Sequence, residues 1–286
     1  MASIAASPAA GRLGLIFLAG LALAGCGETF GGMGPKPQIA ETYAGADAQA
    51  ANSGNIASLS EVIEQHPNDP AAYNTRGVVY AKLGNYSAAI EDFTKTIQLD
   101  PHFSGAYTNR ALAYRQSKKD DLAMADFNQA IAANGNDAAA YLGRGNLERT
   151  HGDYTSATND LNAAIRLNPE GAQAYHARGL IYQRQGNQPQ AITDFNNAID
   201  RDPFAGAPYQ ARGQSMLATG QYQKAVDDFN AALNVNDHNA DAWEGLGEAY
   251  EKLGNREKAV EAYHSAAQLN PGNSDAKAGL ARLSAS

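Results

Sequence analysis

The sequence predicts an all-α protein: a solenoid of six helix–turn–helix units that repeat every 34 residues. An aromatic series recurs at this interval, an alanine series follows 16 residues later, and a third apolar series comes four residues after that. No insertion or deletion breaks the register from Pro70 to Asn273. A fixed period of this size is the signature of stacked repeats, which form one continuous architecture. The three series are Tyr73, Tyr107, Tyr141, Tyr175, Tyr209 and Trp243; Ala89, Ala123, Ala157, Ala191, Ala225 and Ala259; and Phe93, Phe127, Leu161, Phe195, Phe229 and Tyr263.

Each unit is predicted to contain two helices joined by a tight turn. In the first unit, apolar and small residues recur with a 3.6-residue period from Ala72 to Leu83, which indicates an amphipathic helix. Gly84 then supplies the left-handed conformation that ends helices. A second helix is predicted from Tyr86 to Leu99, and it closes before Pro101 because proline cannot continue a helix.

These units resemble the tetratricopeptide repeat (TPR), which has an aromatic residue at position 4, Gly or Ala at position 8, Ala at 20 and an aromatic residue or Leu at 24. The resemblance covers residues 70–273 and implies a right-handed solenoid. Its six repeats are 70–103, 104–137, 138–171, 172–205, 206–239 and 240–273.

Both flanks of the repeats are predicted to cap the ends of the hydrophobic stack, as solenoids require. Segment 56–69 contains a lone second helix at Ile56–Gln65. Segment 274–286 is expected to form a helix with Ser274 as its N-cap, placing Leu280 and Leu283 over the last repeat.

The N-terminus is predicted to be a targeting segment. Arg12 precedes an apolar run of about 11 residues, which is too short to span a bilayer. The run ends in Leu-Ala-Gly-Cys26, which resembles a bacterial lipobox. The resemblance implies a signal peptide over 1–25, acyl chains on Cys26 and a lipid anchor. An ordinary secretory leader with a chance cysteine is the alternative.

Residues 26–55 lack an apolar period and are expected to form a flexible tether behind the lipidated cysteine. Gly27 and Glu28 follow Cys26, whereas an aspartate there tends to retain lipoproteins in the inner membrane. The resemblance therefore favours the periplasmic face of the outer membrane.

Composition and motifs argue against several functions. The net charge is −8 and no run of Lys or Arg occurs, so nucleic acid is not an expected partner. The single cysteine allows neither an intramolecular disulfide nor a thiolate metal site. The six histidines show no metal-ligand spacing, and no phosphate-binding loop is present. We therefore predict no enzyme activity, no metal and no cofactor.

Arginine at position 7 and aspartate at position 23 occur together in five repeats. At 100° per residue, position 7 lies on the packing face of the first helix, where a buried guanidinium needs a partner. Repeat six loses both charges, with Leu246 and Ala262. The pattern predicts an ion pair within each repeat: Arg76–Asp92, Arg110–Asp126, Arg144–Asp160, Arg178–Asp194 and Arg212–Asp228.

The TPR resemblance also implies a partner-binding concave groove lined by positions 2, 5, 9, 12 and 13. Its middle would combine apolar residues with three arginines, and its C-terminal end would be acidic, which suits a peptide or helix carrying both signs of charge. A merely solvated surface is the alternative. The candidate residues are Asn74, Lys82, Leu112, Arg115, Asn146, Arg149, His176, Leu180, Arg184, Gln214, Glu244, Glu248 and Glu251.

A TPR solenoid on a lipid anchor resembles the NlpI-type adaptors, which dock cell-wall hydrolases and proteases at the outer membrane. This implies a non-catalytic scaffold that binds partner proteins or peptides. Two alternatives stay open, a pilotin or other secretion or envelope assembly factor and a glycan-binding structural protein. Exposed aromatic residues would favour glycans, and the candidate groove residues include none.

Overall fold

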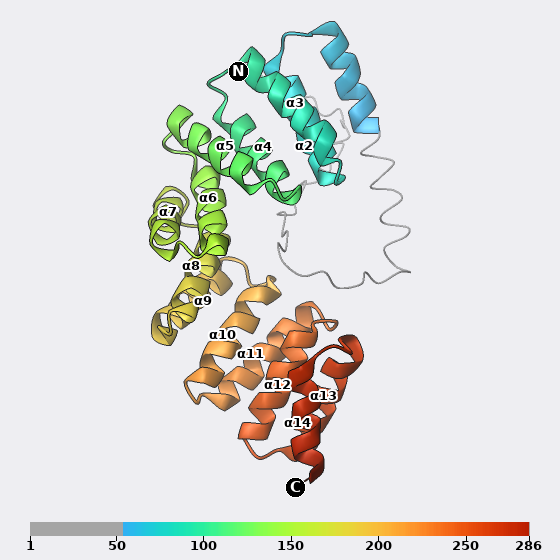
Figure 1. The fold of residues 1–286 in the computed structure, drawn as a ribbon, viewed down its shortest axis with the longest axis vertical. Coiled ribbons are helices and arrows are strands. Elements are labelled where there is room, and N and C mark those ends of the chain that lie inside the picture. The colour runs from blue at the N-terminus through green and yellow to red at the C-terminus, as the bar shows by residue number, and fades with distance from the viewer. Residues whose placement is uncertain (1–53, 286) are drawn as a thin grey trace, which may run out of the picture. The chain divides into compact units, whose positions relative to one another are not determined.

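The computed structural model describes residues 54–285, and this part contains fourteen helices and no strand. The predicted signal peptide, Cys26 and the tether up to residue 53 lie outside the described residues. A helix over residues 54–65 comes first, two residues earlier than predicted, and residues 66–69 form a turn rather than its continuation. The other helices, labelled in Figure 1, are α2 (Pro70–Lys82), α3 (Tyr86–Leu99), α4 (Ser104–Gln116), α5 (Asp120–Ala133), α6 (Ala138–His151), α7 (Tyr154–Leu167), α8 (Ala172–Arg184), α9 (Gln188–Arg201), α10 (Gly206–Ala218), α11 (Tyr222–Val235), α12 (Ala240–Lys252), α13 (Arg256–Leu269) and α14 (Ser274–Ala285).

Turn chemistry sets the helix ends as the sequence predicts. Gly84 has φ of 75°, and the corresponding residue of four other repeats is also a glycine with positive φ. Repeat two uses Lys118 at φ 56° instead, a conformation that costs a side-chain-bearing residue free energy. One detail was wrong: Asn273, not Ser274, caps α14, because its side chain accepts the Ala276 N–H at 2.8 Å.

Inside each repeat, the aromatic residue or Leu at position 24 packs against the small residue at position 8. A Cβ added to Gly77 would lie 2.7 Å from the Phe93 ring, so this glycine permits the contact between α2 and α3. Phe93 is 1% exposed, and its equivalents in the next repeats are equally buried. Each repeat therefore has its own buried contact of this kind, and the buried apolar residues form six clusters along the described stack.

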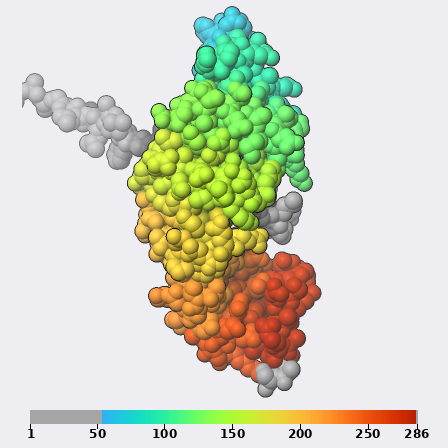
Figure 2. Space-filling view, turned by 60° about the vertical axis from the view of Figure 1, so that its left-hand side comes forward, coloured from blue at the N-terminus to red at the C-terminus, as the bar shows by residue number. Residues whose placement is uncertain are grey.

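The helices contact one another in a pattern that defines an inner side of the stack. Each even-numbered helix touches the next even-numbered helix, whereas among α3 to α13 the odd-numbered helices do not touch one another. The even-numbered helices consequently lie closer together, on the inner side. In Figure 2 the colour changes steadily over the described surface, because each repeat contacts only its neighbours in sequence.

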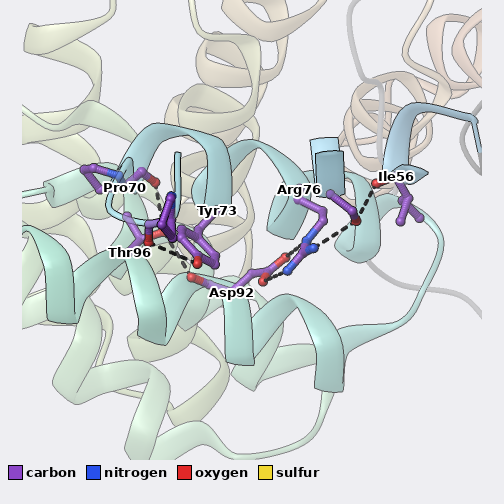
Figure 3. A network of polar contacts seen from close by, with 8 residues as sticks. Ile56, Pro70, Tyr73, Arg76, Asp92 and Thr96 are labelled. Atoms are coloured by element: carbon purple, nitrogen blue, oxygen red, sulfur yellow. Dashed lines mark hydrogen bonds and ion pairs between the residues drawn. The ribbon is translucent and has the colours of Figure 1, made fainter. Parts of the chain in front are cut away.

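All five predicted ion pairs are confirmed within their repeats. Arg76 donates from Nε and Nη2 to both oxygens of Asp92 at 2.8 Å, and the other four pairs have the same geometry at 2.6 to 2.8 Å. Figure 3 shows Arg76 and Asp92 meeting between the two helices of the first repeat. The aspartates are 3 to 6% exposed, so the guanidinium satisfies a carboxylate that is almost fully buried.

Each arginine of the five Arg–Asp pairs, which together we call the ladder, also donates to the helix that precedes its repeat, and this was not predicted. Nη1 of Arg110 donates to Thr94 Oγ1 at 2.9 Å, and Nη1 of Arg144 donates to Asn128 Oδ1 at 2.7 Å. Arg76 makes the same bond to Ser60 of helix 54–65 at 2.9 Å. The ladder therefore connects neighbouring repeats as well as the two helices of one repeat.

Candidate partner-binding groove

The thirteen candidate groove residues all lie on even-numbered helices, on the inner side of the stack. Helical phase explains this, because positions 5, 9, 12 and 13 face away from the ladder arginine at position 7. Asn74 accepts a hydrogen bond from Asn109 at 3.2 Å, which joins α2 to α4. Lys82 and Gln214 are exposed, and Leu112 and Asn146 are half-buried.

Three arginines from consecutive inner helices form the middle of this groove: Arg115 of α4, Arg149 of α6 and Arg184 of α8. Among the described residues, none of the three forms an ion pair. Arg149 and Arg184 line a hollow of about 340 Å³ together with Leu180 and Tyr154. His151, which lines the same hollow, has its Nε2 atom 3.1 Å from Asp120 Oδ2.

Burial makes this cationic cluster unusual. The Arg149 Nε atom is buried and has no hydrogen-bond acceptor. Desolvation lowers the pKa of Arg149. Desolvation also lowers the pKa of Arg115, where the Asp120 charge opposes the shift and the Arg149 charge adds to it. Guanidinium groups stay charged at neutral pH, so the groove holds positive charge with an unused donor. An anionic group in the hollow lined by Arg149 and Arg184 would offset this positive charge.

His176 lies beside the cluster and does not add to its charge. Its ring lies 5.8 Å from the Phe195 ring, and burial followed by the Arg149 charge lowers its pKa to about 4. At neutral pH the imidazole is therefore uncharged.

The acidic end of the groove is mostly engaged by the chain itself. Glu244 accepts a hydrogen bond from Asn273 at 2.8 Å, and burial raises its pKa. Glu251 accepts from Arg282 at 2.9 Å and from Tyr263 at 2.7 Å, and the Arg282 bond lowers its pKa. Glu248 is exposed. Two of the three predicted acidic residues thus also fix α14 against the last repeat.

The sequence prediction overlooked Glu148, which lies next to Arg149 on the packing side of α6. Position 11 is tyrosine in four of the six repeats, so the glutamate in repeat three could have been noticed from the sequence as an acid on the packing face. Its Oε2 atom is buried without a hydrogen-bond partner. Burial, with the nearby Asp160 charge, raises the pKa of Glu148 to about 7.

Neither a metal cluster nor a membrane-spanning helix occurs in the part of the chain that the structure describes: no group of three His, Cys, Asp or Glu residues is placed to hold an ion. Over the same residues, no helix has both the length and the apolar character needed to cross a bilayer.

The geometry defines a helical-repeat scaffold whose inner side is formed by the even-numbered helices. Family models identify the class: tetratricopeptide repeat models match residues 70–103, 104–137, 172–205 and 216–283, and a TPR repeat model matches 145–186. The chain is a TPR protein, and TPR proteins bind protein or peptide partners. No curated protein sequence matches it.

Several solved structures share the fold. Pseudomonas aeruginosa PilF is 19% identical with a TM-score of 0.69, over 74% of this chain and 97% of that one. PilW, a type IV pilus biogenesis factor, is 18% identical with a TM-score of 0.66, over 74% and 98%. YrrB, a TPR protein with an unusual peptide-binding site, is 23% identical with a TM-score of 0.55, over 65% and 96%.

A chain of the APC/C hetero-tetramer Cut9–Hcn1 is 20% identical with a TM-score of 0.70 over 81% of this chain, which spans only 47% of that chain. At these identities the similarity establishes the fold alone.

Proposed function

We propose that this protein is a non-catalytic adaptor of the cell envelope that holds an acidic segment of a partner protein against Arg115, Arg149 and Arg184. One observation supports the proposal most directly: Arg149 has a buried Nε without an acceptor, in a groove where its cationic neighbours have no ion pair among the described residues. A partly desolvated cation is unfavourable by itself, and a partner carboxylate in the hollow lined by Arg149 and Arg184 offsets that cost.

Leu180 lines the same hollow, so the proposed segment carries an apolar side chain next to its carboxylate. In this proposal, Cys26 holds the protein by acyl chains on the periplasmic face of the outer membrane. The partners are cell-wall hydrolases or proteases, as in the adaptors that the architecture resembles.

A second candidate function is assembly of a pilus or secretion system. It is favoured by the shared fold of PilF and of PilW, the latter a type IV pilus biogenesis factor. Both candidates use the same groove chemistry and differ in the protein recovered from it.

The test compares three forms of the protein. In the groove variant, Arg149→Gln and Arg184→Gln remove two cluster charges. The control Arg166→Gln removes the charge of an exposed arginine on α7, outside the inner helices. Circular dichroism verifies that each variant is folded. Partners are cross-linked in cells, co-purified and identified. Peptides matching their acidic segments are then synthesised in two forms, an acidic peptide with Asp and Glu and an amide peptide with Asn and Gln in their place.

We expect the groove variant to bind the acidic peptide roughly ten- to a hundred-fold more weakly, because removing one partner of a desolvated charge pair costs about 2 kcal/mol or more. The Arg166 control should bind normally, and the amide peptide should bind wild type weakly. Equal affinity of the groove variant and wild type for the acidic peptide would refute the proposal.

A further inference from the structure

Beyond the groove, the two ends of the described stack are complementary half repeats. Shifting residues 54–65 by one 34-residue period places them on 88–99, inside α3, so this helix is a second helix without its first. Ser60 accepts a hydrogen bond from Arg76, as Thr94 accepts one from Arg110 one period later, which confirms the register. Shifting α14 back by 34 residues places it on α12, so α14 is a first helix without its second.

The face of helix 54–65 that a first helix would cover is open. Positions 20, 24 and 27 are no more than 2% exposed in all six complete repeats. Their equivalents here are Asn55, which is exposed, Leu59, which is half-buried, and Val62, which is 40% exposed. Within the described residues no helix takes the place of the missing first helix.

The matching face of α14 is open too. Position 8 is buried in every complete repeat, whereas its equivalent Ala281 is exposed. A hollow of about 440 Å³ lies between α13 and α14, lined by Val260, His264, Leu280 and Ala281. A second helix of a further repeat would place its position 24 against Ala281, which lines this hollow.

Charge also matches between the two ends. Position 7 of α14 is Leu280 and position 23 of helix 54–65 is Ser58, so neither end carries a ladder charge that would need a partner. Repeat six has the same uncharged combination, Leu246 with Ala262. Helix 54–65 carries two glutamates and no base, whereas α14 carries Asp275, Lys277 and Arg282, the last of which is paired with Glu251.

We infer that the protein associates head to tail with a second copy of itself, with helix 54–65 of one copy completing a seventh repeat on α14 of the next. Leu59 packs toward Ala281, and Val62 is covered by α14. The contact joins two different surfaces, so it can propagate along a chain of copies. It also continues the row of inner helices from one copy to the next.

The register permits a test in which the ladder pair is built across the interface. Ser58→Asp and Leu280→Arg each place one unpartnered charge in the proposed contact. Mixing these two variants, or combining them in one chain, restores an Arg–Asp pair between copies. Association of the full-length chain in detergent micelles is measured by sedimentation velocity over a wide concentration range, and circular dichroism verifies folding.

The wild type should associate with increasing concentration, and each single variant should associate roughly ten-fold more weakly or worse. The mixture and the double variant should recover association to within a few-fold of wild type. Control variants Ser87→Asp and Leu122→Arg make the same exchanges at exposed sites of α3 and α5 and should change nothing.

A wild type that stays monomeric would overturn the inference. So would single variants that weaken association without rescue on mixing, because another segment would then cover these faces.

Discussion

Arg144→Leu is the sharpest perturbation of the ion-pair ladder. Arg144 donates to the two oxygens of Asp160 at 2.6 and 2.8 Å, and their side chains are 22% and 9% exposed. Removing one partner of a buried pair costs about 3–5 kcal/mol. Because Arg144 retains some contact with solvent, we expect the lower end, about 3 kcal/mol. For a domain of this size that corresponds to a fall in Tm of roughly 6–12 °C.

Adding Asp160→Ala should recover much of this loss. The double variant reproduces the apolar pair of repeat six, where Leu246 and Ala262 are 3% and 2% exposed. Replacing both members of a buried pair by apolar residues is often close to neutral. The wild type, both single variants and the double variant are compared by urea unfolding followed by circular dichroism, which gives the coupling free energy directly.

Repeat two offers a matched control. Arg110→Leu removes the same interaction from Asp126, but position 11 there is Tyr114 rather than an acid. Arg144→Leu should be the more destabilising of the two, because it leaves two neighbouring acids without a counter-charge. The two residues are not partners if the losses in unfolding free energy of Arg144→Leu and Asp160→Ala add up, within about 0.5 kcal/mol, to the loss of the double variant.

Further predictions follow from single sites. Cys26→Ser should abolish incorporation of a palmitate analogue, and label persisting in this variant would contradict the lipobox interpretation. The pKa of Glu148 is raised to about 7 from an ordinary value of 4.5, so the folded state binds its proton more tightly and this group's stabilising contribution is lost as pH rises between these values. Glu148→Gln should therefore raise Tm more at pH 8 than at pH 5, and an equal shift would argue against the burial effect. Gly77→Ala should destabilise by about 1–3 kcal/mol through its clash with Phe93, measured by urea unfolding. Gly105→Ala, with its nearest contact at 3.5 Å, should instead stabilise by up to about 1 kcal/mol because alanine favours helix, and equal effects would contradict the packing argument.

The repeat period made most of the fold predictable. Residues such as Phe93 and Gly77 recur in register, so comparing six copies reveals which positions pack together without any knowledge of the structure. The Arg–Asp pairing was predictable for the same reason, since repeat six loses both charges at once.

Features that lie between repeats or outside them were not predictable. The residues that accept the arginine Nη1 bond from the next repeat vary among Ser, Thr and Asn, so no single residue type marks their position. Arg282 and Asn273 engage the acidic end of the groove from the cap or just before it, where no second copy exists for comparison. The orphaned Nε of Arg149 depends on a side-chain conformation that spacing does not specify.

The ladder also makes the joints between neighbouring repeats chemically unequal. Five joints contain a guanidinium hydrogen bond to the preceding helix, but the joint between α11 and α12 contains Leu246 within an apolar cluster. Apolar contacts weaken on cooling. We expect the last two helical hairpins to separate from each other first in the cold, which hydrogen exchange would measure.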